Sequence, residues 1–598
     1  MKTIEKPSVT SVLKLAILVV LSLAFSCSPD TVLEPEDNLE AVDAKYRKAK
    51  DASKAILKTL VRGAALSGAN GIDIGPDGKL YVASVNGQEI VVMNRHNGKI
   101  IKRFGPGNGV LGPDDLVFGP DGTLYWTDIL TGFVGRMTPD GEQLGYQFVA
   151  PGVNPITFSP DGRLFVALDF LGDGLYELDP NLINEPKPII ECPTGFCLGF
   201  FNSFDFGPDG RLYGPLFALG QVIRMNVDDG SFEEVASGFE NPAAAKFGPD
   251  GMLYVLDQTG EVFKINTENG HKTLFTTLQP GLDNMVFDSD GTLYMTNNDE
   301  GWVAKILPSG HAYTISKGGM IAPQGLAVLA GSNNQDVVFE ADLFRLRQFN
   351  GRSGRQINDY KGYLIPIVPD VGLASLILPM NLSADGDNLV VSSWFSGGVQ
   401  VWNPHDGVTE DYPDFDTPID AIRFKDDIVV SDLGLGGSGL YWASDLGEIV
   451  LPGITLGALG GLATDGETVW VADWATGNIL EIGFEGRTPK TPIKVISGLV
   501  NPEGLALDNS GGLVVVEWGE SRLSRINLST GDRTTIVEGL ELSRPGLGAP
   551  PMWTFDGVAI GQSGDIYVSG GGANVIYRVT QKKDGHGNGH RNGHRNGH

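Results

Sequence analysis

The feature that most constrains this chain is a sequence phrase that recurs twelve times between Gly71 and Thr580. Each copy consists of a short apolar run, a tight turn, a second apolar run, a loop and a third run. The turn reads Gly-Pro-Asp-Gly in four copies, which end at Gly78, Gly122, Gly210 and Gly251. A hairpin turn needs residues that accept a positive φ, and the alternating runs beside it are typical of half-buried strands. The phrase therefore predicts an antiparallel sheet that is repeated along the chain.

The spacing of the copies indicates how these sheets assemble. The turns recur at intervals of about 40 to 50 residues, the range of propeller blades and solenoids, and four strands per repeat favour blades. A single ring of twelve blades would exceed the usual range of about four to eight. We therefore predict an all-β protein with two tandem six-bladed β-propellers, in which each blade is a four-stranded antiparallel sheet.

The two ends of the repeat region suggest how the rings close. The last repeat supplies three strands, and an unpaired strand-like segment, Lys54–Leu60, precedes the first repeat. Pairing an N-terminal strand with the last blade of a ring removes open sheet edges. Applied to both rings, this rule predicts that Lys54–Leu60 completes the sixth blade and that His311–Ser316 completes the twelfth. The two propellers then span residues 53–308 and 309–580, with the boundary at Pro308.

Residues 1–26 have the pattern of a secretory signal peptide. Three lysines precede the apolar run Leu15–Phe25, which is too short to span a bilayer. The run ends before Cys27 in a sequence that resembles a bacterial lipoprotein cleavage site, where this cysteine becomes the lipidated N-terminus. We expect a tether over residues 27–52 and a bacterial cell-envelope protein, at the outer membrane or in the periplasm, that contacts the membrane through its lipid only. Plain secretion is the alternative.

The two remaining cysteines, Cys192 and Cys197, lie in a long insertion between the third and fourth blades. Export permits a disulfide between them, and two free thiols are the alternative. A zinc pair is less favoured because no histidine is near them in sequence. The C-terminal tail, residues 581–598, is rich in Gly, Asn and His and lacks apolar residues from Asp584 onward. It is predicted to be disordered, and weak metal binding by its histidines is the other interpretation.

The charge of the chain limits its partners. With 44 basic and 73 acidic residues, the formal net charge is −29. Nucleic-acid binding requires basic patches that face the phosphates, so no nucleic-acid partner is expected. An acidic surface is compatible with the binding of hard divalent cations.

A ring of polar residues is predicted around each channel, because the residue before the first strand of every blade faces the propeller axis. In the first ring five of six such positions are Asn or Asp, namely Asn70, Asp114, Asn154, Asn202 and Asp283. In the second ring the oxygen-bearing candidates are Gln324, Asp420, Glu503 and Asp556. Converging carboxylate and amide oxygens are the ligands that Ca²⁺ or Mg²⁺ prefers. The alternative is that these side chains only cap nearby backbone amides.

Three phrases carry a resemblance to a known family: Ser67–Gly78, Asn501–Gly512 and Phe555–Gly564. They resemble the repeat of the gluconolactonase, or senescence-marker-protein, family, and also that of NHL and streptogramin-lyase propellers. In the gluconolactonase family, Glu, Asn and Asp residues directly before a strand-opening Gly hold a divalent cation at the channel. The resemblance implies this role for Asn70, Glu503 and Asp556, each followed by Gly. Asn154 and Asn202 match in position only.

The histidines narrow the chemistry that is compatible with this resemblance. Outside the tail they are His96, His271, His311 and His405, all in or beside turns at the blade rims. A Ser-His-Asp triad or a Cys-His dyad therefore lacks a base, and so does an eliminase that uses a channel histidine. What remains is cation-assisted hydrolysis of a small lactone or ester, with Asp114 or Asp283 as the base. The alternative is a non-catalytic lipoprotein that binds a protein or glycan.

Overall fold

The computed structural model of this chain describes residues 55–192, 197–363, 375–434, 437–544, 551–553 and 555–581. The expected signal peptide, the tether with Cys27 and the tail beyond Gln581 lie outside these ranges. Within them the chain forms strands and five short 3₁₀ helices, but no α-helix. The all-β prediction is confirmed. No helix among these residues is long and apolar enough to cross a membrane.

Six sheets follow one another in the first half of the chain, and each pairs its four strands in sequence order. Their strands are β2 (Ile72–Ile74), β3 (Leu80–Ser84), β4 (Glu89–Met93) and β5 (Ile100–Phe104); β6 (Pro113–Phe118), β7 (Leu124–Asp128), β8 (Phe133–Met137) and β9 (Gln143–Phe148); β10 (Val153–Phe158), β11 (Leu164–Leu168), β12 (Gly174–Leu178) and β13 (Lys187–Glu191); β14 (Asp205–Phe206), β15 (Leu212–Leu216), β16 (Gln221–Met225) and β17 (Phe232–Ser237); β18 (Pro242–Phe247), β19 (Leu253–Asp257), β20 (Glu261–Ile265) and β21 (Lys272–Thr277); β22 (Leu282–Phe287), β23 (Leu293–Asn297), β24 (Val303–Ile306) and β25 (Ala312–Ser316). The 3₁₀ helices here are η1 (Pro106–Asn108) and η2 (Phe217–Leu219).

Six further sheets follow in the second half, and the fourth of them carries a fifth strand because β42 also pairs with β40. Their strands are β26 (Leu326–Ala330), β27 (Asp336–Asp342), β28 (Arg345–Asn350) and β29 (Gln356–Lys361); β30 (Asn381–Asp385), β31 (Asn388–Ser393), β32 (Gly398–Asn403) and β33 (Gly407–Tyr412); β34 (Pro418–Phe424), β35 (Asp427–Asp432), β36 (Gly439–Trp442) and β37 (Gly447–Glu448); β38 (Leu459–Thr464), β39 (Thr468–Asp473), β40 (Asn478–Glu485), β41 (Thr488–Pro489) and β42 (Lys494–Ile496); β43 (Pro502–Leu507), β44 (Gly512–Glu517), β45 (Arg522–Asn527) and β46 (Arg533–Glu538); β47 (Val558–Ile560), β48 (Ile566–Gly570), β49 (Val575–Gln581) and β1 (Ala55–Arg62). The 3₁₀ helices are η3 (Ser332–Asn334), η4 (Trp518–Glu520) and η5 (Gly571–Ala573).

The last of these sheets corrects the predicted closure of the rings. Strand β1, which contains most of the segment Lys54–Leu60, pairs antiparallel with β49 in the twelfth sheet, not in the sixth. Strand β25, predicted for the twelfth sheet, pairs with β24 in the sixth. The exchange of strands between rings is therefore wrong, and the chain passes from one ring to the other between Ser316 and Leu326. The predicted boundary at Pro308 falls eight residues before the end of β25.

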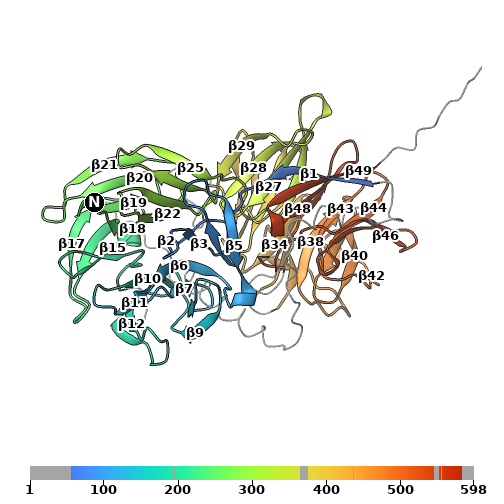
Figure 1. Cartoon of the computed structure of the whole chain (residues 1–598). Helices are drawn as coiled ribbons and strands as arrows, with labels where there is room; N and C mark the ends of the chain where they lie inside the picture. Colours follow the sequence, from blue (N-terminus) through green and yellow to red (C-terminus); the bar gives the residue numbers. More distant parts are fainter. Residues whose placement is uncertain are drawn as a thin grey trace, which may run out of the picture.

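Contacts between the sheets follow two closed circuits of six sheets each, which we call the first ring and the second ring. In the first ring, β2 contacts β6 on one side and β22 on the other, so the sixth sheet meets the first. In the second ring, β26 contacts both β30 and β47 in the same way. Figure 1 shows the first ring in blue to green beside the second in yellow to red, with the blue strand β1 lying among the red strands.

The Gly-Pro-Asp-Gly turn has a direct structural role in each blade. Gly78 has φ +72°, a conformation that L side chains rarely adopt. The Oδ1 atom of Asp77 accepts a hydrogen bond from the backbone N–H of Lys79 at 3.1 Å, and its Oδ2 atom accepts one from the hydroxyl of Tyr81 at 3.3 Å. The aspartate of the motif thus stabilises the turn and also positions the tyrosine of the following strand.

That tyrosine joins neighbouring blades. The ring of Tyr81 lies edge-on to Phe118 of the next blade, with ring centroids 4.8 Å apart. The same pairing recurs around the first ring as Tyr125–Phe158, Tyr213–Phe247 and Tyr254–Phe287. Each such pair contributes about 0.5–1.5 kcal/mol beyond burial of the rings. The repeated phrase therefore encodes the contact between blades as well as the blades themselves.

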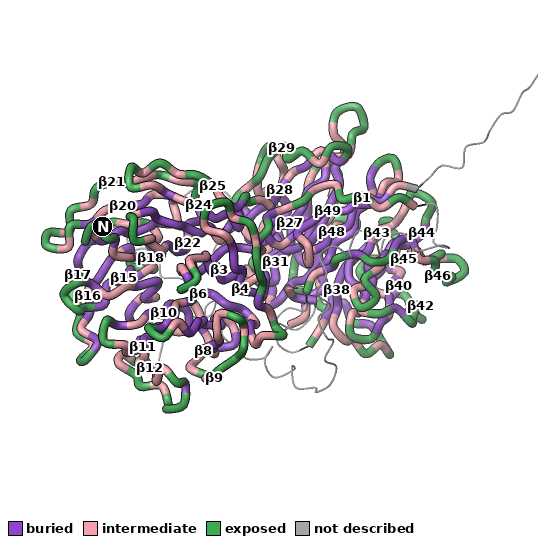
Figure 2. The backbone as a smooth tube through the Cα atoms, viewed as in Figure 1, coloured by how far each residue is buried: buried purple, intermediate pink, exposed green. Residues whose placement is uncertain are grey.

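The apolar core lies between the sheets. The second strand of each sheet in the first ring is buried along its whole length, as in β3 and β7, because both of its faces pack on neighbouring sheets. The fourth strands, such as β5, are largely exposed. Figure 2 shows the buried inner strands in purple and the exposed outer edges and turns in green.

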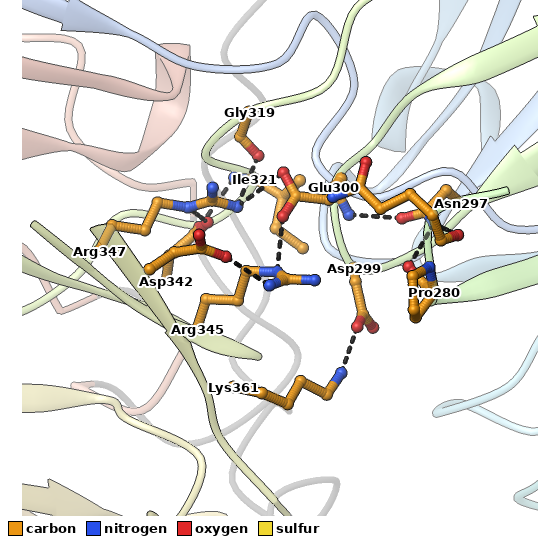
Figure 3. Close-up of polar contacts among 12 residues, drawn as sticks. Pro280, Asn297, Asp299, Glu300, Gly319, Ile321, Asp342, Arg345, Arg347 and Lys361 are labelled. Atoms are coloured by element: carbon orange, nitrogen blue, oxygen red, sulfur yellow. Dashed lines mark hydrogen bonds and ion pairs between the residues drawn. The ribbon is translucent and has the colours of Figure 1, made fainter. Parts of the chain in front are cut away.

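The two rings meet through a buried ion cluster, shown in Figure 3. Glu300, in the loop after β23 of the first ring, forms salt bridges with Arg345 at 2.5 Å and Arg347 at 3.2 Å, both in β28 of the second ring. Arg347 also pairs with Asp342 at 2.6 Å and donates to the backbone carbonyl of Gly319 at 2.9 Å. Arg347 is 2% exposed and Asp342 is fully buried. The rings are therefore joined by charged side chains that are buried from solvent.

Two further polar contacts connect the rings. Asp299, next to Glu300, pairs with Lys361 of β29 (Figure 3). On the other side, Arg544 of the second ring pairs with Glu89 of β4 at 3.4 Å and donates to the backbone carbonyl of Gly87. These contacts bring the loops at one end of the first ring against the corresponding loops of the second ring.

Candidate functional site

The five candidates of the first ring lie at the start of its innermost strands or a few residues before them. Asn70 precedes β2 and Asn202 precedes β14, while Asp114, Asn154 and Asp283 are the second residues of β6, β10 and β22. Asp283 is half-buried and the other four are buried, between 4% and 9% exposed. The sixth position is Ala243 in β18, which brings no oxygen.

The amide side chains differ in how far they are already engaged. Asn70 Oδ1 accepts from the backbone N–H of Val85 at 3.2 Å, and Asn202 Oδ1 accepts from that of Ser203 at 2.7 Å. Both contacts are those of a strand cap. Asn154 instead donates through Nδ2 to a carboxylate oxygen of Asp169 at 2.8 Å. Capping thus accounts for Asn70 and Asn202 but leaves Asn154 with another role.

Asp169 is a site residue that the sequence reading missed. It follows β11, whose last residue pairs with Val153, so it lies beside Asn154 at the same end of the blade. It is fully buried, and its Oδ1 atom has no hydrogen-bond partner among the described residues. The signal in the sequence was an acidic residue at the end of the second strand, but only positions ahead of the turns were considered.

Other acidic residues at the ends of second strands are structural. Asp128 accepts backbone N–H groups from Leu111 and Gly112, in the loop that enters its own blade, at 3.2 and 2.6 Å. Asp257 does the same for Glu240 and Asn241. Asp169 departs from this pattern because its carboxylate reaches a channel side chain instead of the loop.

Asp114, Asp169 and Asp283 influence one another across the channel. Burial, and after it the charge of Asp115, raises the pKa of Asp114 to about 7. Burial raises the pKa of Asp169 well above its usual range, and the charges of Asp114 and Asp283 raise it further. The pKa of Asp283 is likewise raised by burial and then by Asp114. Three carboxylates held this close lack the positive charge that would stabilise them when ionised.

The residues that directly follow Asp114, Asn202 and Asp283 in the sequence are hydrogen-bonded to one another. Asn284 Nδ2 donates to Asp115 Oδ1 at 3.0 Å, and Ser203 Oγ donates to Asn284 Oδ1 at 3.0 Å. These side chains come from the sixth, second and fourth sheets, so their hydrogen bonds cross the ring. The residues next to the candidate carboxylates therefore connect three blades across the first ring.

The described residues contain one group of three His, Cys, Asp or Glu side chains whose ligand atoms all lie within 4.8 Å of one another: Asp173, Cys192 and Cys197. The two cysteines form a disulfide with Cα atoms 5.7 Å apart, so they offer no thiolate to a metal. Asp173 instead accepts three backbone N–H groups of the adjoining loop, from Cys197, Leu198 and Gly199. The channel carboxylates are more widely spaced and would need amide oxygens to complete a coordination shell.

The acidic candidates of the second ring are used by backbone amides. Asp420 accepts from the N–H groups of Ala421 at 2.8 Å and Leu462 at 2.7 Å. The Leu462 amide belongs to the next sheet, so this carboxylate ties two blades together. Asp420 is buried, and burial raises its pKa to about 7.

Asp556 and Glu503 are engaged in the same way. The carboxylate of Asp556 accepts from the N–H groups of Ser543 at 2.7 Å and Gly571 at 3.0 Å. Glu503 Oε2 accepts from the N–H of Asp556 at 2.9 Å. The motif of an acidic residue before a strand-opening Gly, which suggested cation ligands here, is satisfied by backbone contacts between neighbouring blades.

Gln324 is the second-ring candidate whose side chain remains unengaged. Its Oε1 atom is buried without a hydrogen-bond partner in the described structure. Glu340 of β27 lies behind it, fully buried, with both carboxylate oxygens also unpartnered. Burial, with the charge of Asp342, raises the pKa of Glu340 well above its usual range. Asn381 is the first residue of β30, and its Nδ2 atom has no hydrogen-bond partner among the described residues.

The structural role of Asp420 predicts a pH effect. Its pKa of about 7 lies above the ordinary 3.8, so between these values the folded state keeps a proton that the unfolded state has lost. The resulting stability is fully present below about pH 4 and is lost as the pH rises to about 7. The free energy of unfolding of wild type relative to Asp420→Asn should therefore fall by up to about 4 kcal/mol between pH 4 and pH 8.

Urea denaturation across this pH range measures the difference. Exposed Asp414 provides the control, since Asp414→Asn should give a curve parallel to wild type. If the Asp420→Asn curve also runs parallel, Asp420 is ionised in the folded state and the interpretation is wrong.

The described histidines lie away from both channels. His96, His271, His311 and His405 are exposed in turns between the third and fourth strands of their blades or at the start of the fourth strand. A histidine base for either ring is therefore absent from the described residues, as the sequence analysis expected.

Comparisons with known proteins found only distant similarities. A scan against protein-family models found no match, and neither did a search of curated proteins. Similar solved structures include virginiamycin B lyase from Staphylococcus aureus, at 16% identity over 48% of this chain and 95% of that one, with a TM-score of 0.34. A putative gluconolactonase has 16% identity over 44% and 93%, with a TM-score of 0.34.

A third similar structure matches a larger share of the chain. The extracellular domain of a putative hybrid two-component system from B. thetaiotaomicron has 11% identity over 88% of this chain and 82% of its own, with a TM-score of 0.31. The propellers that the sequence resembles, gluconolactonase-like and streptogramin-lyase-like, thus recur among the similar solved structures. Identities this low assign no activity to the chain.

Proposed function

We propose that the first ring holds a divalent cation, Ca²⁺ or Mg²⁺, at Asp114, Asp169 and Asp283, and that this site hydrolyses a lactone or ester. The observation that carries the proposal is the unpartnered Oδ1 atom of fully buried Asp169, beside two further carboxylates. An unpaired buried acceptor costs about 1–3 kcal/mol. A cation would satisfy this oxygen and offset the mutual repulsion of the three groups.

The chemistry of the donor set fits such an ion. Three carboxylates and the amide oxygen of Asn154 are hard oxygen ligands, the kind that Ca²⁺ and Mg²⁺ prefer. The hydrogen bond from Asn154 Nδ2 fixes the carboxylate of Asp169, as outer-shell partners do in metal sites. Hydrogen bonds among Asp115, Asn284 and Ser203 connect the neighbouring positions of three blades, which helps to hold these donors in place.

The residues of the chain supply the remaining parts of the reaction. A bound cation would polarise the carbonyl of the substrate. Asp283 is the least buried of the three residues, so in this proposal it serves as the general base. Asp114 and Asp169 hold the ion and keep their positions through burial.

The site belongs, in this proposal, to a protein of the bacterial cell envelope. The signal-like residues 1–26 and the lipoprotein-like sequence at Cys27 support export and lipid attachment. The disulfide between Cys192 and Cys197 supports an oxidising compartment.

Cation binding predicts a change in stability. Ca²⁺ or Mg²⁺ at one hundred times its Kd should stabilise the folded protein by about 2.7 kcal/mol, roughly 5–10 °C in Tm for a domain of this size. Asp169→Asn keeps the size of the side chain but removes one charge, so it should abolish most of this shift. Differential scanning calorimetry with and without each cation measures it, and Asp414→Asn is the matched control. An equal shift in Asp169→Asn and wild type would contradict the assignment.

The proposed hydrolysis, with Asp283 as the general base, is tested in a separate experiment. Asp283→Asn should lower the hydrolysis of a lactone and ester panel by about 10²–10⁴-fold, the usual contribution of a general base. A protein that shows the cation shift but hydrolyses no member of the panel would retain the cation site and lose the hydrolase assignment.

A further inference from the structure

A cleft lies between the two rings, lined by residues from both. It contains about 690 Å³ of space, open solvent included. Its walls come from Ser67, Val85–Gln88 and Leu130 of the first ring, and from Ile321–Gln324, Leu343, Ser543, Arg544, Trp553, Gly571 and Gly572 of the second. The loops that form the walls are those beside the inner strands of each ring.

The second-ring wall of the cleft presents an acceptor that the protein does not satisfy. Gln324 lines the cleft, is 4% exposed, and its Oε1 atom has no hydrogen-bond partner among the described residues. A buried amide oxygen without a donor is rare in proteins. A ligand that brings hydroxyl or N–H donors would satisfy it.

An aromatic cluster borders the same cleft. Trp553 lies against Trp394 with ring centroids 4.6 Å apart, and Phe395 packs on both. Trp394 is buried, while Trp553 is half-buried and lines the cleft. Because its neighbours fix its position, Trp553 offers a rigid apolar surface at little cost in side-chain entropy.

The charge of the lining indicates what kind of ligand fits. Among the described residues that line the cleft, Arg544 alone carries a charge, and that charge is paired with Glu89. A charged ligand would find no free opposite charge at this surface and would lose its water without compensation. The remaining polar groups are amides, hydroxyls and backbone amides, which suit neutral hydrogen-bonding groups.

We propose that this cleft is a binding site for a neutral polyhydroxylated molecule, a small saccharide. Its hydroxyl groups donate to Gln324 Oε1, and its apolar C–H face lies on the ring of Trp553. The site is separate from the cation site of the first ring and does not depend on it.

The test uses the full chain and a panel of neutral saccharides: glucose, galactose, mannose, maltose and cellobiose. We expect at least one to bind saturably in isothermal titration calorimetry and to raise the Tm. Trp553→Ala and Gln324→Met should each weaken that binding at least tenfold. Trp553→Phe should weaken it less, and this variant is decisive if Trp553→Ala does not fold.

The matched controls are Trp474→Ala and Gln147→Met. Trp474 is half-buried and Gln147 has an unpartnered Oε1, but neither lines the cleft. Both should bind the saccharide as wild type does, and so should Asp169→Asn, which separates this site from the proposed cation site. The proposal is overturned if no saccharide of the panel binds, or if Trp553→Phe and Gln324→Met bind with wild-type affinity.

Discussion

A chain that begins at Gly63 should fold its first ring but not its second. Strand β1 pairs with β49 from Ala55 opposite Gln581 to Arg62 opposite Val575. It also places Ala55 and Leu57 on one apolar core and Leu60 and Val61 on another. Without β1, the edge of β49 is open and can template pairing with other chains.

The expected loss is comparable with the stability of a whole domain, about 5–15 kcal/mol. Residues 63–318 alone should unfold cooperatively and remain monomeric, whereas residues 319–581 alone should aggregate. Calorimetry and size-exclusion chromatography of the two pieces measure this. A deletion of residues 1–54 only is the control and should unfold as the full chain does.

A permuted second ring provides the rescue. Because Ala55 lies opposite Gln581, a two-residue Asn-Gly turn can join the end of β49 to the start of β1. Residues 319–581 followed by this turn and residues 55–62 should therefore fold. If the unpermuted piece already folds as stably as the permuted one, β1 is not required for closure.

Arg347→Met should destabilise the protein by about 3–5 kcal/mol, the usual cost of breaking a buried ion pair. Arg347 stands between Glu300 of the first ring and Asp342 of the second, and all three side chains are at least nine-tenths buried. Removing the guanidinium leaves buried Asp342 without a cationic partner and leaves Glu300 with Arg345 alone. The decrease in the free energy of unfolding should be largest in the unfolding transition in which the two rings separate.

Chemical denaturation measures this effect, and Arg487→Met is the matched control. Arg487 pairs with Asp445 at 2.7 Å on the surface, where both side chains are about half exposed, so its loss should cost at most about 1 kcal/mol. The double variant Arg347→Met/Glu300→Gln should recover part of the lost stability, because the negative charge of Glu300 is then removed together with the positive charge of Arg347. Equal effects of Arg347→Met and Arg487→Met would show that the cluster does not hold the rings together.

The sequence alone determined the all-β class and the four-stranded sheets. The reason is that residues within each repeat specify its turn, its strands and its contact with the next blade. The Gly-Pro-Asp-Gly turn sets the hairpin, and the Tyr and Phe of successive repeats, such as Tyr81 and Phe118, meet across blades. The same local logic placed Asp114 and Asp283 at the openings of inner strands.

Which open edge receives the strand at residues 55–62 was not a local property. Both the sixth and the twelfth sheets could accept a short amphipathic strand, and only the packing of whole rings selects the twelfth. The tertiary structure likewise decided which oxygens remain free. The Leu462 amide of the next blade donates to the carboxylate of Asp420, and the Ser543 amide of the loop before β47 donates to that of Asp556. Asp169 instead contacts Asn154 and keeps one oxygen without a partner among the described residues. A residue type can be read from a repeat, but its hydrogen-bond partners come from segments distant in sequence, whose positions exist only in the folded ring.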